Sequence, residues 1–159
     1  MLFRSHMVLG CAWLAYQPDL ALYELDRART QDLTAIEEAI VRAARAMLFI
    51  KQDWHYHALD ELAAIESRLP ELGRSAAELD TSTAPAEAEA VMAGVLHLMR
   101  YQVYVSLKRN DDAARELALA EAGLRGHERL EAAGHMIAAK LLLDQRRSEE
   151  RRVGKECRL

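Results

Sequence analysis

One short pattern of small and apolar residues occurs three times in this chain. It places a small residue, a leucine and a second small or apolar residue at offsets 0, +4 and +7. The three copies are Ala21-Leu25-Ala28, Ala58-Leu62-Ile65 and Ala113-Leu117-Ala120. These offsets put the three side chains on one face of a helix. Each copy follows a short polar turn, and each turn follows an apolar helical segment, so the pattern predicts a helix–turn–helix hairpin used repeatedly.

The composition favours helices throughout. Alanine and leucine make up about a third of the 159 residues, whereas glycine occurs 7 times and proline 3 times. Alanine and leucine lose little conformational entropy in a helix, so an all-α fold is predicted. Apolar residues at 51% and charged residues at 29% are typical of a folded globular chain.

Turn residues and helical spacing divide the chain into four antiparallel hairpins, at about residues 3–30, 32–70, 86–123 and 128–146. The fourth is incomplete, because no second helix follows its first. Residues 73–85 are small and polar and are predicted to be a loop insertion. Stacking buries apolar faces that one hairpin cannot bury alone. We therefore expect an α-solenoid that is truncated in the fourth hairpin, with self-association possible through its exposed last helix.

The end of the chain has a different character. Residues 147–157 read Arg-Ser-Glu-Glu-Arg-Arg-Val-Gly-Lys-Glu-Cys, which matches a common sequencing adapter translated in one frame. We interpret residues 147–159 as an artefactual tail and set them aside from fold reasoning. We expect the natural protein to continue differently beyond Arg146.

The hairpins resemble the tetratricopeptide repeat, a helix–turn–helix unit of about 34 residues. The second hairpin matches the family positions best, with Ala46, Phe49, Ala58, Leu62 and Pro70. The first hairpin offers Leu9, Gly10 and Trp13 at the corresponding first-helix positions. Two features depart from the family: Arg45 stands where leucine is usual, and the third hairpin keeps only the second-helix signature. The resemblance implies a superhelix with a concave groove lined by first helices, and a protein or peptide partner.

An aromatic and basic stripe on the first helix of the third hairpin is the candidate peptide-binding groove. It consists of His97, Arg100, Tyr104 and Lys108, and Lys51 is expected at the place in the second hairpin that corresponds to Lys108. The resemblance implies that this side faces the groove. Such a stripe could hold an acidic or C-terminal peptide through charge-assisted hydrogen bonds. A solvated amphipathic edge is the alternative interpretation.

Motifs for catalysis are missing from the sequence. It has no phosphate-binding glycine loop, no nucleophile elbow and no zinc-protease motif. We predict no catalytic residues, no cofactor and no metal site. His55 and His57 form the densest histidine cluster, but on a helix their rings point to nearly opposite sides. A small helical enzyme or metal-binding domain that uses these two histidines stays open as an alternative, as does a purely structural spacer.

Charge and hydropathy limit the partners. The net charge is −4, from 21 basic and 25 acidic residues, without the concentrated basic face that nucleic acids need. No apolar run approaches the roughly 20 residues of a membrane span. Two cysteines are too few for a disulfide framework, which favours a reducing cytoplasm. Together these features predict a non-catalytic cytoplasmic scaffold, the sensory or interaction segment of a larger bacterial regulatory protein in signalling.

Overall fold

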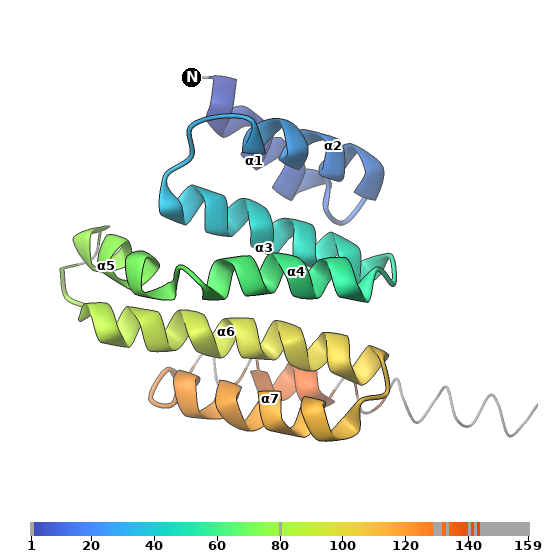
Figure 1. Cartoon of the computed structure of the whole chain (residues 1–159), viewed down its shortest axis with the longest axis vertical. Helices are drawn as coiled ribbons and strands as arrows, with labels where there is room; N and C mark the ends of the chain where they lie inside the picture. The colour runs from blue at the N-terminus through green and yellow to red at the C-terminus, as the bar shows by residue number, and fades with distance from the viewer. Residues whose placement is uncertain are drawn as a thin grey trace, which may run out of the picture.

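The computed structural model describes residues 2–79, 81–128, 132, 134–139, 141 and 143, without the side chains of residues 2–4. Every regular element in this part of the chain is a helix (Figure 1), which confirms the all-α prediction. The helices are α1 (Leu2–Trp13), α2 (Pro18–Arg29), α3 (Ala35–Lys51), α4 (His55–Glu66), α5 (Leu69–Leu79), α6 (Pro85–Ser106) and α7 (Asn110–Leu124). The described residues between 132 and 143 are also helical.

The helices pack in pairs whose order in space follows the sequence (Figure 1). α1 packs on α2, α3 on α4, and α6 on α7. We call α1, α3 and α6 the first helices, and α2, α4 and α7 the second helices. Two of the second helices also touch the next first helix, α2 against α3 and α4 against α6. First helices contact one another as well, since α3 touches both α1 and α6.

Two of the turns that join the pairs have the same backbone geometry. Asp53 and Lys108 adopt left-handed conformations, with φ of 60° and 58°. The following amide reaches back five residues in both turns: Trp54 N–H donates to the Phe49 carbonyl at 2.8 Å, and Arg109 N–H to the Tyr104 carbonyl at 2.9 Å. This is the Schellman helix ending, which satisfies carbonyls at the end of the first helix. Asp53 and Lys108 therefore occupy equivalent positions.

Helix α5 corrects one prediction. Residues 73–85 were predicted to be a loop, with the preceding helix ending at Pro70, but α5 runs from Leu69 to Leu79. Pro70 lies in the first turn of this helix, where its missing N–H costs no hydrogen bond. Leu72 and Gly73 are buried, because α5 packs along the first half of the long helix α6. The polar composition of this segment reflects one exposed helix face rather than a loop.

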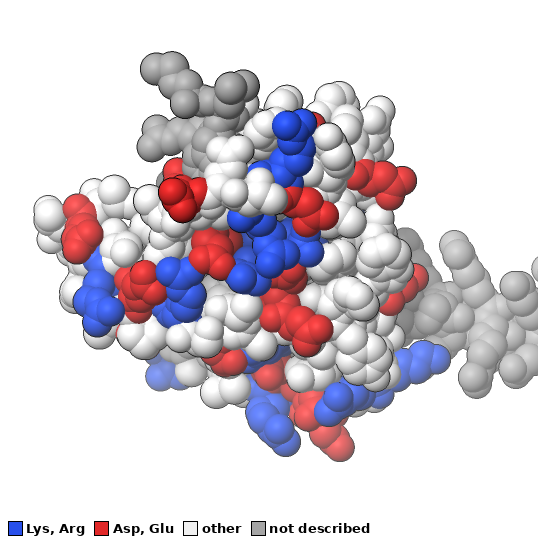
Figure 2. Space-filling model, turned by 45° about the horizontal axis from the view of Figure 1, so that its top comes forward, with Lys and Arg blue, Asp and Glu red and all other residues white. Residues whose placement is uncertain are grey.

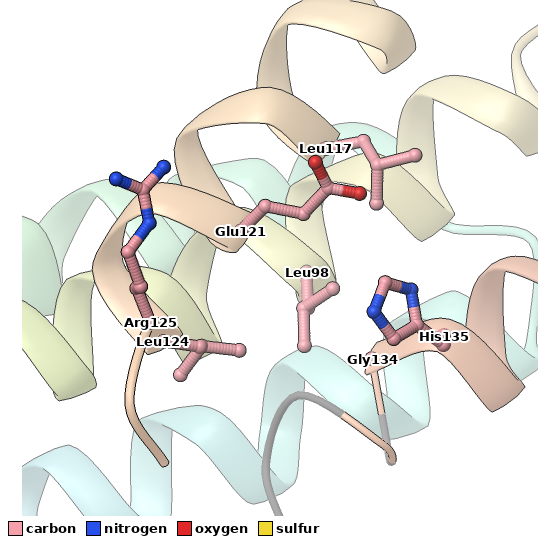
Figure 3. A pocket seen from close by; sticks show the side chains of 7 residues that line it. All are labelled: Leu98, Leu117, Glu121, Leu124, Arg125, Gly134 and His135. Atoms are coloured by element: carbon pink, nitrogen blue, oxygen red, sulfur yellow. The ribbon is translucent and has the colours of Figure 1, made fainter. Parts of the chain in front are cut away.

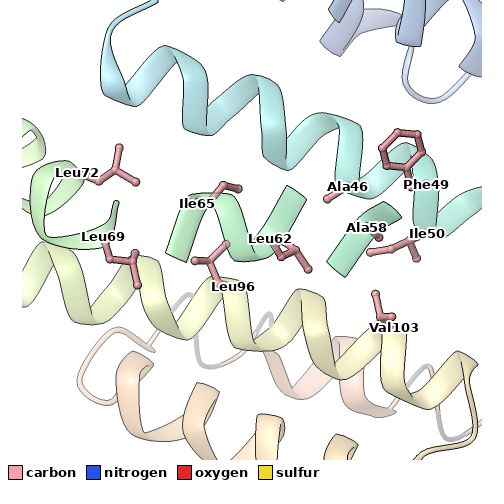
Figure 4. Packing of buried hydrophobic residues seen from close by; sticks show 10 residues of the cluster. All are labelled: Ala46, Phe49, Ile50, Ala58, Leu62, Ile65, Leu69, Leu72, Leu96 and Val103. Atoms are coloured by element: carbon pink, nitrogen blue, oxygen red, sulfur yellow. The ribbon is translucent and has the colours of Figure 1, made fainter. Parts of the chain in front are cut away.

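The repeated second-helix pattern forms the core. Eight of its nine residues are buried, and Leu117 is half-buried. Figure 4 shows α4 lying between α3 and α6, with Leu62 and Ile65 in one cluster with residues of both neighbours. A second cluster joins Ala21, Leu25 and Ala28 of α2 to α3. Burial of this face is the main stabilising term for helices of such modest length.

Glycine permits the closest approaches within two of the pairs. A Cβ placed on Gly10 of α1 would lie 2.7 Å from Leu25 Cγ on α2. A Cβ on Gly94 of α6 would lie 2.8 Å from Leu124 Cγ on α7. Gly123 faces Gly94 directly, because its own added Cβ would be 3.1 Å from Gly94 Cα. These helices can pack this closely only because no side chain intervenes.

Alanine substitutions separate helix propensity from close packing. We expect Gly10→Ala and Gly94→Ala to lower the free energy of unfolding by about 1–3 kcal/mol, because overpacking outweighs the helix propensity of alanine. Gly134→Ala is the matched control, since its Cβ would meet Leu98 Cδ1 at an ordinary 3.4 Å. It should stabilise by about 0.5–1 kcal/mol. Urea denaturation monitored by circular dichroism measures the free energy of unfolding of all three variants. A Gly94→Ala variant that is more stable than the wild type would contradict this account of the close approach.

Candidate functional site

The predicted aromatic and basic stripe of α6 lies against other helices. His97 Nδ1 is 2.7 Å from Glu116 Oε2 on α7. Arg100 holds Glu66 at the end of α4 through two hydrogen bonds of 2.8 and 2.5 Å. This bidentate contact lowers the pKa of the Glu66 carboxyl below its ordinary value. The stripe therefore faces the seam between two second helices.

The other three predicted residues lie at the turns. The Arg109 guanidinium stands 4.9 Å from the centroid of the Tyr104 ring. Lys51 Nζ donates to the Leu14 carbonyl at 3.0 Å, across the turn that follows α1. Lys108 is exposed. Because Lys108 is equivalent to Asp53, the expected correspondence of Lys51 with Lys108 is wrong by two residues.

A polar contact that was not predicted from the sequence joins each helix pair. Every second helix carries a glutamate directly before its central leucine, in the sequence Ala-x-x-Glu-Leu. In each case this carboxylate contacts a basic residue on the first helix. The pairs are His6 with Glu24, Arg42 with Glu61 at 2.9 Å, and His97 with Glu116 at 2.7 Å. We call this contact the helix-pair clamp. The recurring Glu before each Leu was the signal that could have found it.

The clamp of the middle pair belongs to a larger ion-pair network. Glu61 is only 7% exposed and Arg45 only 9%. Arg45 Nε donates to Glu61 Oε1 at 2.8 Å, and its Nη1 contacts Asp26 of α2. Figure 2 shows one face of the molecule, with basic and acidic side chains intermingled across its middle. The connected network contains four arginines and four carboxylates, namely Asp26, Arg29, Glu38, Arg42, Arg45, Glu61, Arg68 and Glu71.

This network ties four helices together, and Arg45 is one of its central members. A buried unpaired charge is costly, so each partner of Glu61 is needed to offset the loss of hydration. Arg45 also stands 5.3 Å from the centroid of the Phe49 ring, which adds a cation–π contact. Hydrogen bonds from Arg42 are the largest cause of the lowered pKa of Glu38. The arrangement is electrically balanced and already satisfied by its own members.

The opposite side of the first helices carries exposed apolar residues. Ile40 and Met47 are 42% and 43% exposed on α3, and Val95 is 38% exposed on α6. Ile40 and Met47 are two helical turns apart and so share one face. Val95 lies on the side of α6 away from His97 and Tyr104. We call these three residues the first-helix face.

His55 and His57 have different surroundings. His57 packs edge-on against Phe49, with ring centroids 5.6 Å apart. His55 Nε2 lies 3.8 Å from Asp53 Oδ1, and its buried Nδ1 has no hydrogen-bond partner. In the described ranges, no three His, Cys, Asp or Glu side chains are grouped closely enough to hold a metal ion. Cys11 is partly buried, and burial raises the pKa of its thiol, which makes it a poor nucleophile.

A cavity of about 290 Å³ lies where α6, α7 and the helix at residues 134–139 meet (Figure 3). Leu98, Leu117 and Leu124 line it, together with Gly134. The charged groups that also line it belong to exposed residues, namely Glu121, Arg125 and His135. Since Gly134 contributes no side chain, the cavity is a gap in packing rather than a built polar site.

Comparisons with protein-family models, curated proteins and solved structures found no match to this chain. None of the helices in the described residues combines the length and apolar character that a bilayer span requires.

Removing the central carboxylate should be strongly destabilising. We expect Glu61→Gln to lower the free energy of unfolding by about 3 kcal/mol, because Arg45 stays buried with one partner fewer. Glu78→Gln is the control, since Glu78 is exposed on α5, and a change within about 0.5 kcal/mol is expected there. Urea titration at neutral pH measures both. Equal effects of the two substitutions would show that the network contributes nothing to folding.

Acid should weaken the fold through two carboxylates that arginines hold ionised. The pKa values of Glu38 and Glu66 are lowered in the folded state. Their stabilisation is therefore fully present above the unfolded-state pKa of about 4.3, and it is lost as the pH falls through the folded-state values. We expect Glu66→Gln to flatten the decline in urea midpoint between pH 6 and pH 3, while Glu78→Gln keeps the wild-type slope. A Glu66→Gln variant with an unchanged slope would contradict this assignment.

Proposed function

We propose that this chain is part of a tetratricopeptide-like α-solenoid that serves as a non-catalytic scaffold for a protein or peptide partner. The observation that carries the proposal is the equivalence of the helix pairs. Two turns share the left-handed residue and the five-residue hydrogen bond, at Asp53 and Lys108. All three pairs share the clamp and the buried small residues.

Aromatic contacts at the turns extend this equivalence. Trp54 stacks on Phe49 with ring centroids 5.9 Å apart, and Arg109 stacks on Tyr104 in the equivalent place. Contacts of α3 with both α1 and α6 supply the continuous row of first helices that a solenoid presents to a partner. Repeated units with no catalytic motif favour a binding surface over a reaction site.

The first-helix face is the best candidate for contact with the partner. His97 and Arg100 of the predicted groove stripe have carboxylate partners within the molecule. Ile40, Met47 and Val95 are apolar and exposed on neighbouring helices, as the anchors of a peptide-binding surface would be. In this proposal, Lys51 and Lys108 lie at the edge of the surface and could favour an acidic partner.

The wider setting is also a proposal. The Ala-, Arg- and Leu-rich helical composition resembles that of interaction segments in larger bacterial regulatory proteins. On this basis, the chain contributes recognition in the cytoplasm, and signalling output comes from other parts of the protein.

A peptide library displayed on phage tests the binding function. We expect the full chain to enrich a peptide family, and the Ile40→Glu/Met47→Glu variant to bind the enriched peptides at least tenfold more weakly. Leu119→Glu is the matched control, because Leu119 is 44% exposed on the second helix α7, and it should bind like the wild type. Failure to enrich any peptide, or equal binding by the double variant, would favour a structural spacer.

A further inference from the structure

Two of the three helix-pair clamps contain a histidine. His6 meets Glu24 in the first pair, and His97 meets Glu116 in the third, where Nδ1 is 2.7 Å from Oε2. Arg42 holds the same position in the middle pair. An imidazole gains and loses its proton near neutral pH, whereas a guanidinium stays charged. The three clamps are therefore alike in place and different in chemistry.

The glutamates of the clamps differ in the permanent charges around them. Glu61 lies within ion-pair distance of three arginines, at 2.8, 2.9 and 3.6 Å. Among the described residues, the basic group within ion-pair distance of Glu116 is His97, and that of Glu24 is His6. Glu116 and Glu24 are mostly buried, with side chains 13% and 14% exposed. A cation stabilises a carboxylate in such a place more than a neutral donor does.

The surroundings of His97 are acidic on balance. Glu116 faces it from α7, and Arg100 and Tyr104 share its side of α6. Arg100 is the main cause of the lowered pKa of the Glu66 carboxyl at the end of α4, and the charge of His97 adds a smaller effect. Two carboxylates and one guanidinium thus surround the imidazole, and its proton balances the charge of the group. α3 and α5 also pack on α6, but in the described residues neither brings a carboxylate within ion-pair distance of His97.

The surroundings of His6 are simpler. Glu24 faces it from α2, and its Nδ1 points at the carboxylate as that of His97 does. α3 also packs on α1, but among the side chains that the structure describes it brings no carboxylate within ion-pair distance of His6. An ionised carboxylate can only accept, so a neutral imidazole in this geometry has to donate its Nδ1–H.

We propose that the clamps of the first and third pairs are pH-sensitive, so that mild acid tightens these two pairs and leaves the clamp of the middle pair unchanged. Protonation of His6 and His97 turns a hydrogen bond from a neutral imidazole into an ion pair with the same carboxylate. Unfolding separates the two groups, so the ion pair favours the folded chain. Its contribution is present below the ordinary imidazole titration range, at about pH 6.5, and is lost as the pH rises above that range. The inference rests on helix pairing and does not depend on the peptide-binding function.

Urea denaturation of the full chain at pH 5.5 and pH 8 tests the proposal. The measured quantity is the difference in urea midpoint between the wild type and His97→Gln, since glutamine can donate a hydrogen bond but carries no charge. We expect this difference to be at least about twofold larger at pH 5.5 than at pH 8. Arg42→Gln is the matched control in the middle pair, and its difference from the wild type should be equal at the two pH values. An equal difference for His97→Gln would overturn the proposal.

Exchange of the two kinds of clamp residue gives a second test. Relative to the wild type, His97→Arg should be more stable at pH 8 than at pH 5.5, because its charge no longer depends on pH in this range. Arg42→His should show the opposite order, because the middle clamp then needs a proton. Any other order in either variant would contradict the proposal.

Nitrogen-15 NMR of the histidine rings examines the third clamp without a substitution. At pH 8, the neutral ring of His97 should carry its proton on Nδ1, because Nδ1 faces the Glu116 carboxylate. A neutral His97 ring with its proton on Nε2 would overturn the proposed clamp.

Discussion

The structure depends on how closely each first helix approaches the second helix that follows it. Gly10 and Gly94 remove the side chains that would hold the helices apart, while the alanine that begins each second-helix pattern keeps part of the opposite surface flat. Packing of this kind is apolar and tolerates sliding along the helix axis. The helix-pair clamp adds a directional polar contact at one fixed level of each pair, and a polar group that loses its partner in a partly buried place is costly. Small residues thus set the separation of the helices, and the clamp helps to set their register.

The middle pair shows how this constraint extends through the fold. Glu61 contacts Arg42 and Arg45 of α3 within its own pair, and it contacts Arg29 of α2 in the neighbouring pair. Arg45 in turn reaches Asp26 of α2, so one carboxylate links three helices. An arginine suits this position because its guanidinium stays charged and can bond in several directions at once. Arg45 therefore has a structural role, in which ion pairs supply part of the connection between the helix pairs.

Most helices could be predicted from the sequence, but the contacts of their polar side chains could not. Apolar spacing at 0, +4 and +7 located the buried face of every second helix, because burial leaves a periodic pattern. Helix α5 was missed because Pro70 ends one helix or begins another with equal ease, and only the packing against α6 decides between them. The clamp was missed because a search for apolar periodicity passes over charged positions, although the Glu before each Leu was visible. The stripe at His97 and Arg100 was predicted to line a peptide-binding groove, but helical spacing alone cannot say whether a basic residue faces a partner or a neighbouring helix.

The two exposed apolar surfaces have different physical meanings. Helix α3 packs Val41 and Leu48 against α2 and packs Ala46 and Ile50 in the cluster of α4, so both of its pairing faces are occupied. Ile40 and Met47 take no part in those contacts, and their exposed apolar surface adds no hydrophobic stabilisation to the fold. The helix at residues 134–139 packs Gly134 against Leu98 and Leu124, and Met136 lies exposed on another face. Among the residues that the structure describes, this helix makes one such pairing, whereas α3 makes two. A partner at the first-helix face therefore has to bring its own geometry, because α3 already uses both of its pairing faces.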